Sequence, residues 1–372
     1  MGKKIIIVCK SFYPEISPRS FRATELAKEF ARQGHEVTVI FPNKGRDYSE
    51  FRKENNINIK DLGKLKFSGI ELRGKGLILL IRRAVRRIMN LFFEYPDIEL
   101  MFKVARALKN EKGYDLLISI AVPHPIHWGV AKVWKKGQQI ARTWVADCGD
   151  PYMFARLDTF NKPFYFRYFE KNFCRKCDYI TVPVESARKG YYSEFHQKIR
   201  VIPQGFRFDE IQLPEYKKIN KYPTFAYAGS FIPGRRDPRP LLEYLSRLNI
   251  DFKFYIYTSH KNILTPFKKA LNSRLEIKKP VPRNELLKIL ATMDFLVNFD
   301  NNTDEQIPSK LIDYAIIGRP ILDIRKELDT NTIIKFLNGN YNNALKIDNI
   351  EKYRIENVCN AFLELCNNEF ND

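Results

Sequence analysis

Several features of membrane-spanning, secreted or metal-containing proteins are missing from this 372-residue sequence. No apolar run approaches the roughly 18 residues of a transmembrane helix, and the N-terminus enters an apolar strand without the hydrophobic region of a signal peptide. Six cysteines are too few for a disulfide scaffold in so long a chain. Cys174 and Cys177 have zinc-ligand spacing but no second such pair, so we expect free thiols, no metal and a cytoplasmic protein.

Acidic residues are scarce in the first part of the chain. Residues 1–210 contain 39 Lys and Arg against 23 Asp and Glu, whereas residues 211–372 contain 24 against 20. Most of the formal net charge of +20 therefore lies in the first part. Such asymmetry indicates an anionic partner there, for which membrane phospholipid, a phosphorylated substrate and nucleic acid are the candidates. No nucleic-acid recognition motif supports the last of these, so we expect no nucleic-acid partner.

Strand and helix patterns alternate along the chain in two blocks. Apolar, β-branched runs predict buried strands at 3–9, 37–41, 115–120, 140–146, 179–182 and 200–202 in the first block. In the second block they predict strands at 224–228, 252–258, 275–277, 295–299 and 320–323. We therefore predict an α/β protein with two Rossmann-like, doubly wound domains facing a cleft.

The predicted domain boundaries follow from composition. The first domain covers residues 1–208, the polar and lysine-rich stretch 209–223 is the linker, and the second domain covers 224–345. Residues 346–372 form a C-terminal helix that we expect to pack back on the first domain. No Gly-x-Gly-x-x-Gly follows a predicted strand, which argues against a dinucleotide-binding enzyme.

The segment after the strand at 295–299 has the features of a phosphate site. It reads Glu305-Gln-Ile-Pro308-Ser309-Lys310-Leu311-Ile-Asp313. Pro308 suits the first helical turn, so the N–H groups of Ser309, Lys310 and Leu311 would be free at an electropositive helix N-terminus. Asp313 shares a helix face with Ser309, from which it could accept hydrogen bonds from ribose hydroxyls. The alternative is an ordinary amphipathic helix with a solvated acid at each end.

This segment resembles the Glu-x7-Glu region of GT-B glycosyltransferases, especially family 4 members with a Pro-Ser-Lys-Leu signature. The resemblance implies that Glu305 lies near the donor sugar as a catalytic group and that Pro308, Ser309, Lys310 and Leu311 cradle the donor diphosphate. It also implies that Asp313 holds the ribose. The family has Glu at that place, so the reach of Asp313 is one methylene shorter.

A second resemblance lies after the strand at 224–228, in Gly229-Ser230-Phe-Ile-Pro-Gly-Arg235-Arg236. It looks like the start of the family's C-terminal domain, where an Arg after the Gly and a Lys five residues later bind the donor diphosphate. Ser230 replaces the first of these cations and Arg235 the second, with Arg236 an equal candidate. Arg suits bidentate phosphate contacts. The alternative is a basic surface turn.

The N-terminal segment Tyr13-Pro-Glu-Ile-Ser17-Pro18-Arg19-Ser-Phe-Arg22 is similar to the family's opening, where many members have Gly-Gly in place of Ser17-Pro18. Because Pro18 lacks an N–H group, we expect no backbone contact to phosphate there. Ser17, Arg19 and Arg22 are predicted on the acceptor side, where the two arginines supply positive charge. The alternative is that both arginines are solvated helix cations.

A fourth resemblance is Ala146-Asp147-Cys148-Gly149-Asp150-Pro-Tyr152, which is similar to the Ala-Asp-Phe-Arg-Asp-Pro-Trp segment of capsule and lipid-saccharide members. Cys148-Gly149 replaces Phe-Arg. Asp150 at the end of a strand is the expected catalytic group of this part, with His127 as a second catalytic candidate and His124 beside it on the acceptor side. The alternative for both histidines is a structural role.

The stretch 73–95 contains a basic amphipathic helix. Arg82, Arg83, Arg86 and Arg87 fall on one side, apolar residues fall on the other, and no acid occurs between Glu71 and Glu94. Such a helix can lie in a lipid interface with its cations among anionic headgroups. The alternative is a core-packed helix with an arginine-rich solvent face.

Together these features predict a GT-B glycosyltransferase that moves a hexosyl group from a nucleoside-diphosphate sugar to a glycan acceptor, which we expect to be linked to a polyprenyl diphosphate. We expect a role in bacterial surface polysaccharide (capsule) biosynthesis, on the inner face of the cytoplasmic membrane. The resemblance implies retention of anomeric configuration. No Asp-x-Asp occurs, so we expect no metal and no cofactor. The alternatives are a GT-B-type sugar-nucleotide epimerase and a non-catalytic GT-B subunit that binds nucleotide sugar.

Overall fold

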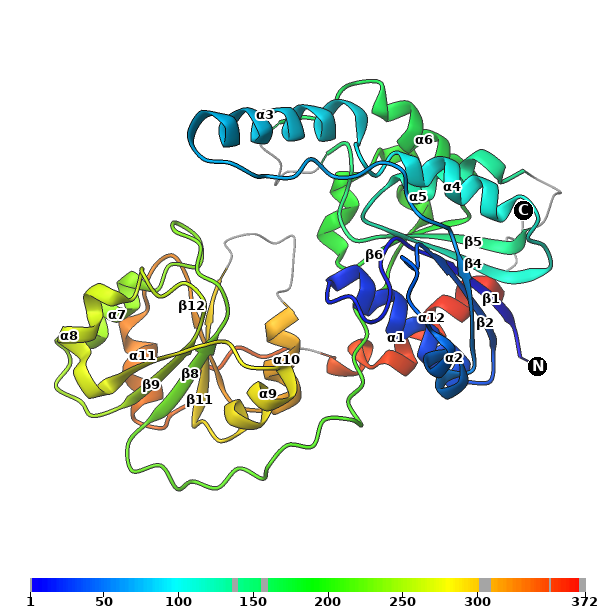
Figure 1. Cartoon of the computed structure of the whole chain (residues 1–372). Helices are drawn as coiled ribbons and strands as arrows, with labels where there is room; N and C mark the ends of the chain where they lie inside the picture. Colours follow the sequence, from blue (N-terminus) through cyan, green and yellow to red (C-terminus); the bar gives the residue numbers. More distant parts are fainter. Residues whose placement is uncertain (1, 136–139, 155–159, 301–308, 348, 368–372) are drawn as a thin grey trace. The chain divides into compact units, whose positions relative to one another are not determined.

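The computed structural model describes residues 2–135, 140–154, 160–300, 309–347 and 349–367. The chain forms two compact units, of which the first comprises residues 1–206 and 352–372 and the second comprises residues 207–351. Each unit contains one β-sheet with helices on both faces (Figure 1). Paired strands of both sheets run parallel. The predicted α/β class with two Rossmann-like, doubly wound domains is confirmed.

The sheet of the first unit has seven strands in the order β3-β2-β1-β4-β5-β6-β7. They are β1 (Lys4–Val8), β2 (Glu36–Phe41), β3 (Ile57–Asp61), β4 (Tyr114–Ala121), β5 (Ala141–Cys148), β6 (Tyr179–Val182) and β7 (Ile199–Val201). β1 pairs with both β2 and β4, so the strand order reverses between β1 and β4. Ligands of doubly wound sheets bind beyond the carboxyl ends of the strands at such a reversal.

Helices cover both faces of this sheet because its central strands are apolar on both sides. Ile5 of β1 lies in one core with Phe30, and Ile6 lies in the opposite core with Trp128. The first face carries α1 (Pro18–Arg32), α2 (Ser49–Asn55) and α12 (Ile355–Asn367). The second face carries α4 (Glu99–Leu108), α5 (Pro125–Val133) and α6 (Phe166–Lys176). The short 3₁₀ helices η1 (Glu185–Gly190) and η2 (Ser193–Lys198) lie between β6 and β7.

The polar composition of the stretch 43–75 predicts irregular structure, but two elements of the first unit, α2 and β3, lie within it. In α2 only Phe51 is buried, and β3 is an edge strand in which Ile57 alone is buried. Neither element therefore has a strong apolar period, which is the main signal for secondary structure in a single sequence.

The two points at which the chain leaves and re-enters the first unit lie side by side. The N–H group of Phe206 donates to the carbonyl of Tyr353 at 2.8 Å, and the N–H group of Ile355 donates to the carbonyl of Phe206 at 3.0 Å. α12 then packs against α1, with Phe362 fully buried between them and the sheet. The C-terminal segment thus completes one hydrophobic core of the first unit.

The sheet of the second unit has five strands in the order β10-β9-β8-β11-β12. They are β8 (Thr224–Ala228), β9 (Lys253–Tyr257), β10 (Leu275–Lys278), β11 (Phe295–Phe299) and β12 (Ile321–Ile324). One face carries α7 (Arg239–Arg247), α8 (Lys268–Leu271) and α11 (Thr330–Leu337). The other face carries α9 (Arg283–Ala291) and α10 (Ser309–Ile317). The strand order reverses between β8 and β11, which places the switch point of this sheet there.

The stretch 209–223, for which the sequence predicts a linker, belongs to the second unit. The hydroxyl of Tyr216 donates to the carboxylate of Asp294 at 2.6 Å, and the guanidinium of Arg319 lies 3.3 Å from the centre of the Tyr216 ring. Ile211 and Leu213 pack against the core on the α9 and α10 face. The division between the two units therefore lies at residues 206 and 207.

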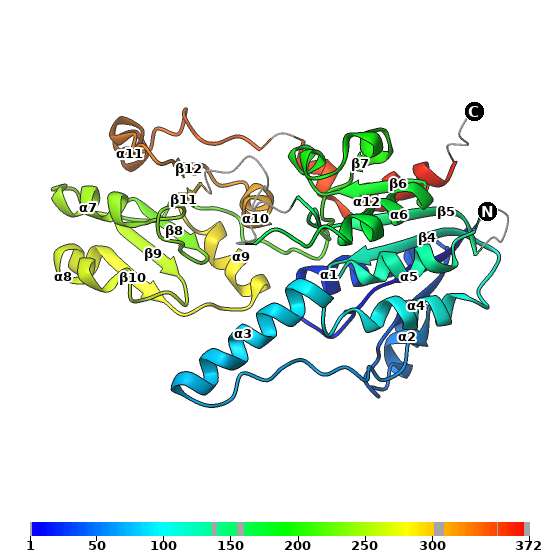
Figure 2. The ribbon, with the colours of Figure 1, turned by 90° about the horizontal axis from the view of Figure 1, so that it is seen from above.

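Helix α3 (Gly76–Phe93) differs from the other long helices because none of its residues is buried. It extends past the end of the sheet of the first unit (Figure 2). The alternative of a core-packed helix is therefore wrong for this segment.

Candidate functional site

A pocket of about 290 Å³ lies at the carboxyl ends of β8 and β9 in the second unit. Its lining comprises residues 228–230 after β8, 257–259 after β9, 280–281 after β10, and side chains of α9 and α10. Apolar side chains of α9 form one wall, and Lys310 and Asp313 of α10 bring the charged groups. This is the place in a doubly wound sheet where a ligand is expected.

Lys310 lines this pocket with an ammonium group that has no hydrogen-bond partner among the described residues. Its Nζ lies 4.5 Å from the centre of the Tyr227 ring. Burial and the nearby Arg236 lower the pKa of Lys310 to about 7, and the more distant Asp323 and Asp300 oppose this shift. A buried cation without a partner is costly, so its position favours an anionic ligand.

The loop after β8 brings a second cation to the same place. Arg236 is half-buried, and its Nε has no partner among the described residues. Burial raises the pKa of Tyr227 and Arg236 opposes that rise, whereas burial and Arg236 together lower the pKa of Lys310. Arg235 is exposed. Of the two arginines that the sequence leaves open, the structure therefore places Arg236 beside Lys310.

Gly229 is needed where this loop begins. Its φ is +146°, and a Cβ atom there would lie 3.0 Å from the hydroxyl oxygen of Tyr227. That hydroxyl donates to the carbonyl of Ser230 at 2.9 Å and so holds the loop. The Ser230 side chain is exposed at the pocket.

Helix α10 is anchored so that its N-terminus lies at the end of β8. Leu311 and Tyr314 are buried, and the Tyr314 hydroxyl accepts a hydrogen bond from the N–H group of Ala228 at 3.1 Å. The helix begins at Ser309, so the N–H groups of its first turn have no acceptor within the helix. Glu305 and Pro308 lie outside the described residues.

Asp313 lies one turn along α10 and also lines the pocket. Its carboxylate accepts hydrogen bonds from Nε and Nη2 of Arg283 at 3.1 and 2.6 Å. Burial raises the pKa of Asp313, and Arg283 opposes that rise. The pocket thus joins the unpartnered ammonium of Lys310 and a helix N-terminus to one paired carboxylate, an arrangement suited to binding a diphosphate next to a hydroxyl-bearing group.

The sequence profile of glycosyltransferase family 4 matches residues 21–210, which is just over half of the chain. The chain belongs to glycosyltransferase family 4. A search of curated protein sequences finds no match.

Solved structures of similar architecture include the apo form of lipopolysaccharide outer core galactosyltransferase WaaB, with a TM-score of 0.60, 12% identity, and coverage of 97% of this chain and 99% of WaaB. A glycosyltransferase from Rickettsia africae gives a TM-score of 0.58 at 13% identity, covering 98% of this chain and 94% of its own. S. aureus TarM in complex with fondaparinux, alpha-GlcNAc-glycerol and UDP gives 0.52 at 13% identity, covering 98% and 93%. The fold of this family 4 glycosyltransferase is therefore GT-B.

In the first unit of the glycosyltransferase, Ser17 and Arg22 have structural positions. The Ser17 hydroxyl caps α1 by accepting from the N–H group of Ser20 at 3.1 Å. Arg22 is 3% exposed and donates through Nε and Nη2 to Asp147 at 3.1 and 2.8 Å. Its Nη2 also donates to the carbonyl of Ile202 at 3.2 Å. The expectation of an acceptor-side cation at Arg22 is therefore wrong, because buried protein groups occupy its guanidinium.

Arg19 is half-buried and lies directly over the backbone of Gly149. A Cβ atom on residue 149 would lie 2.3 Å from Cζ of Arg19, so a larger residue there would displace the guanidinium from this position. Arg19 thus takes the space in which a side chain at 149 would begin. Asp150 follows at the exposed end of β5. Together Arg19 and Asp150 are the charged groups that the glycosyltransferase presents at this strand end.

His124 and His127 lie in the interior of the first unit. His127 Nδ1 is 2.8 Å from the Ser119 hydroxyl, and its Nε2 is 3.3 Å from Cys148 Sγ. Burial lowers the pKa of His127 to about 3, and burial with the neighbouring His127 lowers the pKa of His124 well below its usual range. Both rings are therefore neutral at physiological pH. The expectation of a catalytic His127 is wrong for this structure, because the ring is fully buried among protein groups.

Cys174 and Cys177 are buried free thiols, as expected. Within the described ranges, no three His, Cys, Asp or Glu side chains are grouped so that they could hold a metal ion.

On α3, Arg82, Arg83, Arg86 and Arg87 are all exposed, and so are most apolar residues of the helix, such as Leu77 at 73%. No helix in the described part of the chain is long and apolar enough to cross a membrane.

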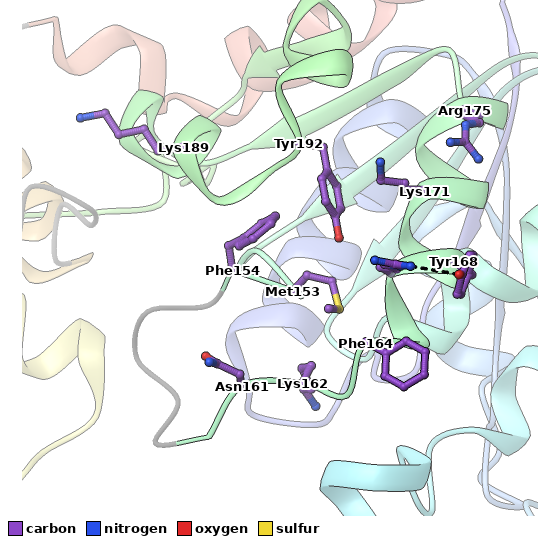
Figure 3. A pocket seen from close by; sticks show the side chains of 11 residues that line it. Met153, Phe154, Asn161, Lys162, Phe164, Tyr168, Lys171, Arg175, Lys189 and Tyr192 are labelled. Atoms are coloured by element: carbon purple, nitrogen blue, oxygen red, sulfur yellow. Dashed lines mark hydrogen bonds between the residues drawn. The ribbon is translucent and has the colours of Figure 1, made fainter.

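A second pocket, of about 930 Å³, lies in the first unit between α6 and the η1 helix (Figure 3). Sequence reasoning missed it, although all of its described lining residues lie between 153 and 192. The available signal was the run Lys162-Pro-Phe-Tyr-Phe-Arg-Tyr-Phe-Glu-Lys171, in which aromatic residues and cations are interleaved without an apolar period.

Proposed function

We propose that this glycosyltransferase moves a hexosyl group from a nucleoside-diphosphate sugar to a glycan hydroxyl, with retention and without a metal ion. The observation that carries the proposal is the buried, unpartnered ammonium of Lys310 in the pocket at the ends of β8 and β9. Arg236 and the N-terminus of α10 add positive charge at the same place. The S. aureus TarM complex that shares the fold contains UDP, a nucleoside diphosphate.

In the proposed reaction, the bond between the anomeric carbon and the diphosphate oxygen breaks, and its electron pair stays on the diphosphate. The acceptor oxygen forms the new bond to the anomeric carbon, and the acceptor hydroxyl loses its proton. Negative charge grows on the leaving diphosphate, where Lys310, Arg236 and the first-turn N–H groups of α10 stabilise it. These groups take the place of a divalent cation. We propose that Asp313 accepts hydrogen bonds from the ribose hydroxyls and that Glu305 is a catalytic group near the donor sugar.

The acceptor that we propose is a lipid-linked saccharide in bacterial surface polysaccharide synthesis, reached from the inner face of the cytoplasmic membrane. The cations and exposed apolar residues of α3 suit an anionic lipid interface. No acid lies between Glu71 and Glu94 to oppose such binding. One protein of the same fold, WaaB, is by its name a lipopolysaccharide galactosyltransferase.

Saturation-transfer NMR with a panel of nucleotide sugars tests the donor half of the proposal. We expect binding of one or a few nucleoside-diphosphate sugars, release of the free diphosphate over time, and loss of that release in Glu305→Gln. Retention of donor binding without any turnover across the panel would support a non-catalytic subunit instead. Activity that persists in excess EDTA would support the absence of a metal.

Vesicle flotation tests the membrane half. Replacing Arg82, Arg83, Arg86 and Arg87 by Glu should release the protein from anionic vesicles, because the cations then repel the lipid headgroups. A matched control replaces four exposed lysines of the second unit by Glu, namely Lys261, Lys268, Lys269 and Lys279. Equal loss of binding in both variants would show that only the net charge matters, and unchanged binding of the arginine variant would refute docking through α3.

A further inference from the structure

The side chains that line the second pocket carry an excess of positive charge. Five cations line it and no acid does, namely Lys162, Arg167, Lys171, Arg175 and Lys189. We call this set with its aromatic neighbours the cation–aromatic pocket. Figure 3 shows Lys171 and Arg175 along one side, from α6, and Lys189 on the opposite side. An excess of one sign of charge around a cavity favours a ligand of the opposite sign.

The carboxylates beside the pocket neutralise only part of this charge. Glu194 lies 2.8 Å from Lys171 and 3.9 Å from Arg175, and Glu94 pairs with Lys162. Arg167 donates only to the hydroxyl of Tyr168, at 3.0 Å, and neither it nor Lys189 has an acidic partner in the described part of the chain. Glu94 and Glu194 therefore pair with three of the five cations, and Arg167 and Lys189 are left without an acidic partner among the described residues.

Aromatic faces complete the pocket. They belong to Phe154, Phe164, Tyr168 and Tyr192. Lys171 Nζ lies 4.4 Å from the centre of the Tyr192 ring, and Phe154 packs edge-on against the same ring at 4.9 Å. Phe164 is 69% exposed, although it is a large apolar side chain. Exposed aromatic faces beside polar donors suit a ring with one apolar and one polar side, as in a sugar.

The rim of the pocket is tied to the end of α3. The Tyr165 hydroxyl donates to the carbonyl of Phe92, and the Tyr152 hydroxyl donates to Glu94, which also pairs with Lys162 of the pocket. The guanidinium of Arg87 lies 5.5 Å from the centre of the exposed Phe160 ring. The pocket and the apolar, exposed surface of α3 are thus neighbouring parts of one surface of the first unit.

We infer that the cation–aromatic pocket binds the phosphate groups of a lipid-linked acceptor, with its aromatic side chains against the adjoining sugar. The inference rests on the proposed glycosyltransferase function and names where its acceptor is held. A ligand that combines an anionic headgroup with a long apolar chain matches both halves of this surface, since the headgroup enters the pocket while the chain stays in the lipid beside α3. A free phosphate compound would use only the pocket.

Cosedimentation with vesicles tests this inference. The probes are phosphatidylcholine vesicles that carry polyprenyl diphosphate and phosphatidylcholine–phosphatidylglycerol vesicles matched in surface charge. We expect the full chain to bind the diphosphate vesicles about tenfold more tightly, because charge-assisted contacts add to simple attraction. The double variant Arg167→Gln with Lys189→Gln should lose this preference and retain its binding to the phosphatidylglycerol vesicles. A matched control, Lys109→Gln with Lys112→Gln, changes two exposed lysines of the same unit and should keep the preference.

Three outcomes would overturn the inference. They are no preference for the diphosphate vesicles in the unmodified chain, an undiminished preference in the pocket variant, and an equal loss in the control variant. Free pyrophosphate distinguishes the source of the phosphate, because strong competition by it at low concentration would assign the pocket to a soluble ligand instead. Donor binding by NMR is measured on the same variants. If the unmodified chain binds no donor but its preference for the diphosphate vesicles depends on Arg167 and Lys189, the proposed function is refuted. The inference that the pocket binds a lipid-linked phosphate is then still supported.

Discussion

Arg22 in the first unit and Lys310 in the second are both cations in a protein interior, but their surroundings differ. Arg22 is held by the two carboxylate oxygens of Asp147 and by backbone carbonyls, and its guanidinium lies 5.2 Å from the centre of the Phe362 ring. Burial opposes ionisation of Asp147, but Arg22 outweighs it and lowers the pKa of that carboxyl. Lys310 has no hydrogen-bond partner among the described residues, and its pKa is lowered to about 7.

We infer from this difference that Arg22 is part of a structural ion pair, whereas Lys310 is available to bind an anionic ligand. A paired buried cation stabilises its own neighbourhood only while its partner is present, and removal of one partner leaves the other uncompensated. An unpaired one costs folding free energy that binding of an anion can recover. Glu170 provides a third case, because it is fully buried, burial outweighs the opposing charge of Lys171, and it accepts a hydrogen bond from the N–H group of Met153, which lines the cation–aromatic pocket.

The largest effect should come from breaking the paired case. Arg22→Met leaves Asp147 buried without a counterion and should lower the free energy of unfolding by about 3–5 kcal/mol. Urea denaturation followed by circular dichroism measures it. Arg73→Met in the same unit is the control, since Arg73 and its partner Glu71 are both exposed and their ion pair should contribute less than about 1 kcal/mol. Similar losses in the two variants would contradict the assignment of Arg22 as a core ion pair.

Glu170→Gln should stabilise the protein, and only at higher pH. Burial raises the pKa of Glu170 from its usual 4.5 to about 7, so the folded state holds a proton that the unfolded state releases. The unmodified chain therefore loses stability as pH rises from 4.5 to 7, by up to about 3 kcal/mol. The variant should match it near pH 4.5 and exceed it above pH 7 in melting temperature. Glu54→Gln, an exposed control, should show no such pH-dependent gain.

Lys310→Met tests the unpaired case. Loss of a charge-assisted contact to the donor diphosphate should weaken nucleotide-sugar binding about 10- to 100-fold. Isothermal titration calorimetry measures the affinity, with the exposed Lys261→Met as the control. The free energy of unfolding should not fall, since no partner is left uncompensated. A large loss of stability with unchanged donor affinity would show that Lys310, like Arg22, has a structural role and does not bind the donor.

The pH dependence of donor binding gives the smallest effect. Below pH 7 the Lys310 ammonium is charged before the anion arrives, and above pH 7 binding must first take up a proton. Donor affinity should therefore fall by up to about tenfold from pH 6 to pH 8, and this fall should be absent in Lys310→Met. A fall of the same size in that variant would assign the pH dependence to another group.

Most of the fold could be predicted from the sequence. The eleven strands that apolar runs predict are all present, because buried parallel strands have a strong local signature. The edge strand β3 and the short helix α2 were not predicted, because each of them buries only one side chain. The donor-side segment around Lys310 was also recognisable, because a proline at the start of a helix and the residues that follow it are local features.

The remaining parts of the site depend on contacts that no local pattern carries. Arg235 and Arg236 are equivalent in the sequence, and only the packing of Tyr227 places Arg236 beside Lys310. The sequence around Arg22 is typical of an exposed cation on a helix, and only the tertiary structure brings Asp147, 125 residues away, into contact with it. His127 has the appearance of a strand-end ligand until Ser119 and Cys148 enclose it.

The sequence by itself determined the two doubly wound domains, the helix that begins at Ser309, and the cationic helix at 76–93. These depend on periodicity and on residues close together along the chain. The tertiary structure alone decided which cations are paired, which are free, and where free cations and aromatic side chains meet in one pocket. The reason is that burial and charge pairing depend on groups that the fold brings together from distant parts of the chain. A buried cation is structural where a carboxylate of the protein pairs with it, and it can bind an anionic ligand where none does.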